Sequence, residues 1–144
     1  MTIKQISVFV ENSSGSLNAM TSVLAAHNID MRALSLAETA DFGIARIIVD
    51  DVYKGTTVLK DAGYIHTITT VLGVAIPDTP GGLNTILSHL AEAKVNVEYM
   101  YAFMGVRENS TAYMIFHVAD PAVASAALMS KGVRLLEQDD LENI

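Results

Sequence analysis

Apolar and polar residues alternate between residues 3 and 10, which predicts a half-buried strand with Ile6, Val8 and Val10 on one face. From residue 16 to residue 27 the spacing of apolar residues becomes that of a helix. Two apolar runs follow, "MRALSLA" and "FGIARIIV", and the polar segment "ETAD" between them predicts a hairpin. A second helix and a short last strand in "YIHTI" complete the order βαββαβ.

The same pattern returns 66 positions later in the chain. Identical residues at this offset include Gly15 and Gly81, Leu17 and Leu83, Asn18 and Asn84, Ser22 and Ser88, Leu24 and Leu90, and Ala25 and Ala91. Further on, the offset grows to about 70, which indicates an insertion near "GVRENS" in the second copy. Two copies at so long a period indicate a duplicated domain, with one module at residues 1–68 and the other at residues 69–144.

This element order predicts the α+β fold class, with two ferredoxin-like βαββαβ modules. The second copy has the cleaner signals. Its first helix carries Leu83, Ile86, Leu87 and Leu90 on one face. Asp120 is placed to cap its second helix, with Pro121 as the first helical residue and Gly132 beyond the end. The segment "VRLLE" predicts its last strand.

The hairpin strands "FGIARIIV" and "YMYAFM" (99–104) are apolar on both faces, or nearly so. A sheet with helices on one face and water on the other should alternate instead. The second face is therefore covered either within the chain or by another chain. Because only four helices are predicted, we favour another chain and expect a homodimer.

Composition narrows the classes of partner and location. Hydrophobic residues make up 51% of the 144 residues and charged residues 17%, and the net charge of −7 disfavours nucleic acid. No apolar run reaches the length of a membrane span, the N-terminus lacks a signal-peptide pattern, and cysteine is absent. We therefore expect a cytoplasmic protein without a membrane partner. The four histidines share no metal-ligand spacing, so neither a metal nor a cofactor is expected.

The turn between the first strand and the first helix has similar chemistry in both copies. Thr79 and Pro80 in "IPDTPGGL" fit a helix cap and a first helical residue, and Ser13 and Ser14 in "VENSSGSL" fill the same places. The glycine that follows each pair lets a ligand approach the backbone. The free amides of a first helical turn favour a carboxylate or a phosphate. On spacing alone, a turn that only starts a helix explains the same residues.

These loops and the repeated βαββαβ order resemble ACT domains, which are small regulatory modules that bind amino acids. The stretch "VENSSGSL" is similar to the first loop of acetolactate synthase small subunits and to the loop in the regulatory domain of phosphoglycerate dehydrogenase. The family pattern is roughly N-x-P-G-x-L, followed 18 residues after the asparagine by "NI" on the second strand. As two tandem modules, the resemblance covers nearly the whole chain.

Each copy departs from this pattern at one loop position. The first copy matches at Asn12, Gly15 and Leu17 but has Ser14 where proline is usual, and counting 18 residues from Asn12 reaches Asp30.

The second copy has Asp78 in place of asparagine and matches at Pro80, Gly81 and Leu83. Counting 18 residues from Asp78 reaches Asn96, in "VNV".

The resemblance also implies where a ligand binds. ACT modules typically pair side by side through the second strand, which would give an eight-stranded antiparallel sheet with four helices on one face. The loop of one module would then face the second strand of the other, with Asn12 near Asn96 and Asp78 near Asp30. The residues that this arrangement assigns to amino-acid binding are Asn12, Ser13, Ser14, Gly15, Ser16, Leu17, Asn96, Val97, Asp78, Thr79, Pro80, Gly81, Gly82, Leu83, Asp30 and Met31.

The two implied sites differ in charge. The asparagine pair is neutral, whereas the aspartate pair brings two carboxylates together and needs a cationic ligand, or Arg32 or Arg46, to balance them. A neutral amino acid should therefore prefer the asparagine site. Asn28 is a rival for the role of Asp30, because it also stands in an "NI" pair, but its spacing is 16 residues.

Together these features imply an amino-acid-binding regulatory protein that is not an enzyme. Three alternatives stay open: a regulatory subunit that docks on a biosynthetic enzyme such as acetolactate synthase, a small ferredoxin-like enzyme, and a scaffold that has lost its ligand. Acetolactate synthase small subunits carry one ACT module, so the second copy argues against strict equivalence. Because the predicted fold brings no nucleophile and base together, no catalytic residue is assigned.

Overall fold

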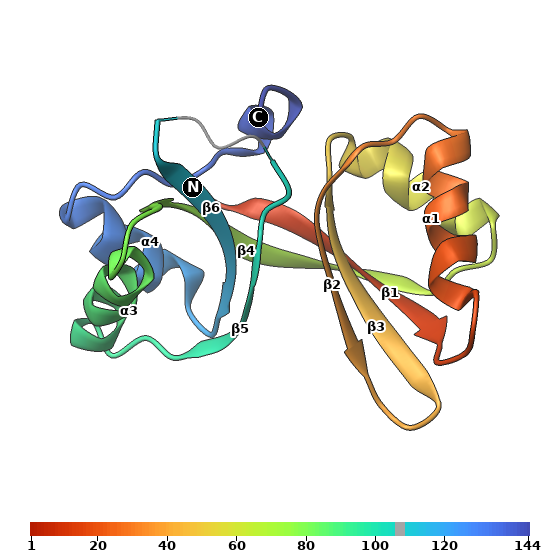
Figure 1. Ribbon diagram of the computed structural model, residues 1–144, viewed down its shortest axis with the longest axis horizontal. Coiled ribbons are helices and arrows are strands. Elements are labelled where there is room, and N and C mark those ends of the chain that lie inside the picture. The colour runs from red at the N-terminus through yellow and green to blue at the C-terminus, as the bar shows by residue number, and fades with distance from the viewer. Residues whose placement is uncertain (106–108) are drawn as a thin grey trace. The chain divides into compact units, whose positions relative to one another are not determined.

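The computed structural model describes residues 1–105 and 109–144 (Figure 1). The predicted insertion at "GVRENS" falls partly on residues 106–108, outside the described residues. The chain divides into two compact units. We call Lys4–Thr69 the N-terminal unit, and Met1–Ile3 together with Thr70–Ile144 the C-terminal unit. None of the helices in the described part of the chain has the length and hydrophobicity that crossing a bilayer requires.

The N-terminal unit has the predicted order βαββαβ. Its elements are β1 (Ile3–Glu11), α1 (Ser16–Ala26), β2 (Met31–Glu38), β3 (Phe42–Val49), α2 (Val52–Asp61) and the first part of β4 (His66–Pro77). The strands are hydrogen-bonded in the order β2-β3-β1-β4. This is the 4-1-3-2 order of a ferredoxin-like module, so the sequence prediction for this copy is confirmed.

The core of this unit lies between the sheet and its two helices, which lie side by side (Figure 1). Ile6, Val8 and Val10 face this core, as their alternation predicts, and Met20 and Leu24 meet them from α1. The helices bury one face of the sheet because both amphipathic patterns direct their apolar sides inward.

The C-terminal unit repeats this arrangement. Its elements are the second part of β4, α3 (Gly82–Glu92), β5 (Val97–Ala102), β6 (Thr111–Val118), α4 (Pro121–Ser130) and the 3₁₀-helix η1 (Gln138–Glu142). Its strands follow the order β4-β6-β5. Helices α3 and α4 lie side by side over a core that includes Ile86, Leu90, Phe116 and Leu128 (Figure 1).

The predicted ends of α4 are confirmed. The backbone amide of Val123 donates to Oδ1 of Asp120 at 3.2 Å, and Pro121 is the first helical residue. Beyond the helix, Gly132 adopts a φ of +77°, a left-handed conformation that favours glycine.

In the described part of the chain the full strand order, β2-β3-β1-β4-β6-β5, has six strands, whereas eight were expected. One strand is lost because β4, with 12 residues, supplies both the last strand of the first copy and the first strand of the second. The other is lost because "VRLLE" forms only a single bridge, between Val74 and Leu135. The strand stops there because Glu137 caps η1, its backbone amide donating to Oδ2 of Asp140 at 2.7 Å.

Candidate functional site

In the loops after β1 and β4 the N-cap residue lies later than the sequence predicts. Gly15 and Gly81, with φ of +85° and +84°, are the N-cap residues of α1 and α3. The prediction that Ser13 or Thr79 is the cap is therefore wrong. The reason is that each loop first closes a turn, in which the amide of Ser16 donates to the carbonyl of Ser13 at 3.2 Å, and only then becomes helical. The left-handed φ that this turn requires suits glycine.

The four α-helices of residues 1–105 and 109–144 fall into two classes by their caps. Helices α2 and α4 are capped by side chains, since Asp51 and Asp120 each accept a hydrogen bond from a first-turn amide. Helices α1 and α3 have no side-chain cap. In the two predicted ligand loops no side chain caps the helix, so first-turn amides can donate to another partner. Amides of this kind favour an anion.

The β1–α1 loop is fastened to the β2–β3 hairpin through Asn12. Its backbone amide donates to the carbonyl of Asp41 at 3.1 Å, and its side-chain Nδ2 donates to the carbonyl of Thr39 at 3.3 Å. The hydroxyl groups of Ser13 and Ser16 are hydrogen-bonded to each other at 2.6 Å. With the nitrogen of the Asn12 side chain occupied, its oxygen is the atom suited to accept from a ligand.

A cavity of about 310 Å³ lies beside this loop, within the N-terminal unit. It is lined by Val10, Glu11, Asn12, Ser13, Leu17, Leu36, Glu38 and Gly43. Its volume is at the lower end of the range of about 300–1,000 Å³ for small-molecule pockets. Three predicted site residues line it: Asn12, Ser13 and Leu17.

The β4–α3 loop is built differently. The amide of Asp78 donates to the carbonyl of Ser110 at 2.7 Å, which ties this loop to the β5–β6 hairpin. Thr79 and Pro80 are exposed in the turn. A Cβ atom on Gly82 would lie 2.0 Å from the carbonyl oxygen of Pro77, so this position has to be glycine. The matched position in the other loop, Ser16, carries a side chain.

The second-strand residues lie at the other end of each first helix. Asp30 is exposed just before β2, and Arg32 forms an ion pair with its carboxylate at 3.1 Å. Asn28 has a φ of +55° in the turn after α1, so the geometry makes it a turn residue and gives no support to its rival role. Lys94, at the matched position, has a φ of +58°.

Asn96 is likewise exposed just before β5, whose first residue is the half-buried Val97. The residue pairs implied by the ACT resemblance combine loops and strands of different units, so these pairs stay predictions.

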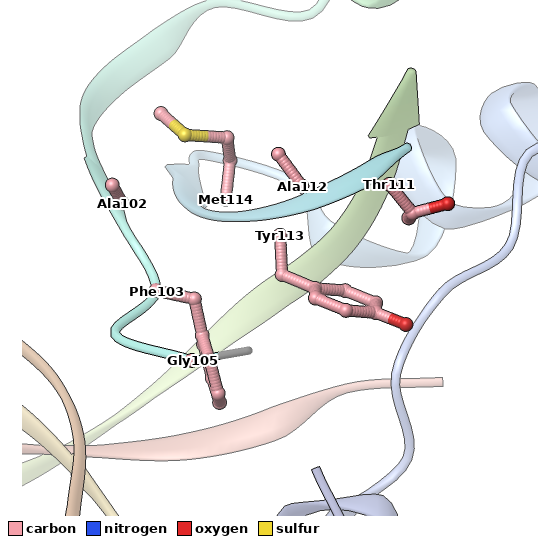
Figure 2. A pocket seen from close by; sticks show the side chains of 7 residues that line it. All are labelled: Ala102, Phe103, Gly105, Thr111, Ala112, Tyr113 and Met114. Atoms are coloured by element: carbon pink, nitrogen blue, oxygen red, sulfur yellow. The ribbon is translucent and has the colours of Figure 1, made fainter. Parts of the chain in front are cut away.

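A second cavity, of about 130 Å³, lies at the end of the β5–β6 hairpin (Figure 2). The rings of Phe103 and Tyr113 lie edge to face on one side of it, with centroids 6.1 Å apart. Met114 and Ala112 point to the other side of β6 (Figure 2). This volume is well below the usual range for a ligand pocket. Within the described residues no group of three metal-ligating side chains is present.

Five residues that line the cavity beside Asn12 were missed by the sequence prediction of the site: Val10, Glu11, Leu36, Glu38 and Gly43. Leu36 and Glu38 lie at the end of β2, whereas the ACT pattern directs attention to its start. The signal that could have found them is strand alternation, which places positions 36 and 38 on the helix-facing side together with Leu34.

Comparisons with known proteins agree with this architecture. A family model described as an ACT domain pair matches residues 1–144. The crystal structure of protein BT0572 from Bacteroides thetaiotaomicron is similar, with 40% identity, coverage of 100% of this chain and 98% of that chain, and a TM-score of 0.92. Among proteins with curated descriptions, none matches the sequence.

Two regulatory subunits of aspartate kinase share the fold. The one from Thermus thermophilus, in a ligand-free form, has 15% identity, coverage of 90% of both chains and a TM-score of 0.65. The one from Thermus flavus has 14% identity, coverage of 88% of both chains and a TM-score of 0.60. Because the family model matches residues 1–144, the chain belongs to the ACT domain pair family.

Proposed function

We propose that the protein is a regulatory ACT domain pair that binds an amino acid and has no catalytic activity of its own. The observation that carries this proposal is the contrast in helix caps. Helices α1 and α3 begin at left-handed glycines without a side-chain cap, whereas α2 and α4 are capped by aspartates. A duplicated loop that keeps its first-turn amides available suits a ligand carboxylate.

In the proposed complex the ligand's carboxylate accepts hydrogen bonds from first-turn amides of α1 or α3 beyond Ser16 or Gly82, since the amides of these two residues close the loop turns. Its ammonium group donates to loop and strand oxygens, including the side-chain oxygen of Asn12. A charge-assisted hydrogen bond contributes about 1.5–3 kcal/mol. Two or three of them give dissociation constants between micromolar and millimolar, the range of a metabolite sensor.

Each proposed site is completed by the start of a second strand, with Asn96 and Val97 near Asn12, and with Asp30 and Met31 near Asp78. The strands β2 and β5 are the first and last members of the strand order, so each has an edge that another strand can pair with. We propose that this side-by-side pairing occurs between two copies of the chain, which would make the protein a homodimer.

The charge difference between the sites is smaller than the sequence suggests. Arg32 pairs with Asp30 at 3.1 Å and balances one of the two aspartates. We keep the proposal that a neutral amino acid prefers the Asn12 site, because the cavity of about 310 Å³ lies beside Asn12.

A thermal-shift screen against the twenty amino acids tests the proposed function. Because a ligand stabilises the folded state by RT ln(1 + [L]/Kd), an amino acid at 100 times its Kd adds about 2.7 kcal/mol of stability. We expect at least one amino acid at 10 mM to raise Tm by several degrees. If none of the twenty shifts Tm, the protein is not an amino-acid sensor.

A second candidate is a regulatory subunit that docks on a separate biosynthetic enzyme. The solved regulatory subunits of aspartate kinase favour it, because one aligns with 90% of this chain and 90% of its own. Affinity capture from a cell lysate, followed by mass spectrometry, would identify such an enzyme as a stoichiometric partner. A ligand-responsive protein that captures no enzyme would favour the stand-alone sensor.

A further inference from the structure

The cavity beside Asn12 is built on a row of residues that crosses three strands. On β1 Val10 pairs with Gly43 of β3, and Gly43 pairs with Glu38 of β2. Side chains of directly paired residues point to the same face of a sheet. Val10 faces the helix-covered core, so Glu38 points to that face as well. Glu11 also lines the cavity, but as the neighbour of Val10 it directs its side chain to the opposite face.

Gly43, which has no side chain, forms the floor of the cavity. A Cβ atom at this position would lie 3.2 Å from Cδ1 of Leu36 and 3.4 Å from Cγ2 of Val10. Those two side chains and Leu17 form an apolar wall. Leu36 is 51% exposed although it stands on the core-facing side of β2, so a ligand can still cover it.

The polar side of the cavity is a carboxylate. Within residues 1–105 and 109–144 the side chain of Glu38 has no ion-pair or hydrogen-bond partner. It lines the same cavity as Asn12 and Ser13 of the loop. A cation that enters this space therefore meets one negative charge that no arginine or lysine of the described chain already balances.

The matched position in the C-terminal unit has neither feature. Ile76 pairs with Ala112 as Val10 pairs with Gly43, so alanine replaces the glycine of the floor. Ala102 pairs with Met114, and two residues later Met104 stands where the other unit has Glu38. Figure 2 shows Ala102, Ala112 and Met114 beside the smaller cavity. The two units thus differ at the residues that give the first cavity its room and its charge.

We propose that this cavity is the specificity pocket for an aliphatic L-amino acid, with Glu38 as the acceptor of the ligand's ammonium group. The proposal rests on the proposed function, in which first-turn amides of α1 beyond Ser16 hold the ligand's carboxylate. The ammonium group then donates to the Glu38 carboxylate. The aliphatic side chain covers Leu17 and Leu36 above Gly43. A ligand side chain with its own negative charge is disfavoured, because it would bring a second anion next to Glu38.

Isothermal titration calorimetry with three probes tests the ligand class. L-leucine has all three groups, 4-methylpentanoate lacks the ammonium, and L-aspartate replaces the aliphatic side chain with a carboxylate. We expect L-leucine to bind at least tenfold more tightly than either of the other probes. Equal affinity for L-leucine and 4-methylpentanoate would show that no carboxylate receives the ammonium and would overturn the proposal.

Two pairs of variants test the residues. Glu38→Gln keeps the size of the side chain and removes its charge, and should weaken L-leucine binding about tenfold or more. Its control is Asp41→Asn, which removes a charge from the same hairpin outside the cavity lining. Gly43→Val should fill the cavity and weaken L-leucine binding. Its control is Ala112→Val, the matched change in the other unit. Leu36→Ser, at an exposed position, tests the apolar wall should Gly43→Val fail to fold.

The outcomes separate this proposal from the proposed function. If Gly15→Val abolishes L-leucine binding while Glu38→Gln, Leu36→Ser and Gly43→Val leave it unchanged, the loop binds amino acids and the specificity pocket is refuted. If Glu38→Gln and Asp41→Asn weaken binding equally, Glu38 acts only through overall charge and the proposal is again refuted. If the wild-type protein binds none of the twenty amino acids, the proposed function itself fails.

Discussion

At the scale of single residues, the glycines in the two loops are constrained in different ways. Gly15 and Gly81 have φ near +85°, and a Cβ on either would have open space around it. Gly82, in contrast, lies against the carbonyl of Pro77 and has no room for a Cβ. The first two positions are therefore constrained by backbone conformation and available to a ligand, whereas the third is constrained by packing.

Substituting Gly15 tests the loop directly. Gly15→Val should abolish amino-acid binding at that loop, because the side chain opposes the left-handed φ and obstructs the approach to the helix amides. The conformational cost is about 1–2 kcal/mol, which a folded domain can survive. Gly63→Val is the control, since Gly63 has a φ of +88° and equal space in the turn after α2, which is not one of the two proposed ligand loops. If calorimetry finds that Gly15→Val and Gly81→Val both bind an amino acid as tightly as the wild type, the two loops only start their helices.

Asn12 and Asp78 allow a second test at this scale. Asn12→Ala removes the proposed ligand acceptor and the hydrogen bond to Thr39 at 3.3 Å, so it should weaken binding of a neutral amino acid more than Asp78→Ala does at pH 7. Titration of both variants with the same amino acid measures the difference. Two equivalent sites, or a larger loss in Asp78→Ala, would contradict the preference for the Asn12 site.

At the scale of elements, caps separate α2 and α4 from α1 and α3, the two helices that we propose to bind a ligand. Asp51 accepts from the amide of Lys54 at 3.0 Å, and Asp120 accepts from the amide of Val123 at 3.2 Å. Both aspartates satisfy a first-turn donor and carry a negative charge at the positive end of the helix dipole. Helices α2 and α4 therefore start without a ligand.

Removing one such cap should cost stability without affecting ligand binding. Asp120→Ala should lower the free energy of unfolding by about 1 kcal/mol, whereas Asp120→Asn, which keeps an acceptor oxygen, should lose less. Urea denaturation followed by circular dichroism measures both. An Asp120→Ala variant as stable as the wild type would show that this hydrogen bond contributes nothing to α4.

At the scale of the whole molecule, apolar side chains remain at the surface of the chain. In the N-terminal unit the exposed set includes Phe9, Leu36, Phe42, Ile65 and Ile68. Single exposed apolar residues are ordinary, but several within one small unit favour an interface. They agree with the sequence observation that "FGIARIIV" is apolar on nearly both faces.

The assembly prediction follows from these side chains and from the edge strands β2 and β5. Light scattering at micromolar protein concentration should give twice the chain mass of 15.4 kDa. Phe42→Glu, at a position 56% exposed, should shift the equilibrium toward monomer if the β2–β3 hairpin lies in the interface. A mass near that of a single chain for the wild type would refute the homodimer.

The sequence by itself determined the βαββαβ order of the first module, the βαββα order of the second, the core-facing side chains Ile6, Val8 and Val10, and the cap of α4 by Asp120. Each of these follows from local periodicity or from hydrogen bonds between residues close in sequence. Tertiary structure alone decided the fusion of two expected strands into β4 and the row Val10–Gly43–Glu38. These depend on register and side-chain direction across separate strands, which no single stretch of sequence encodes.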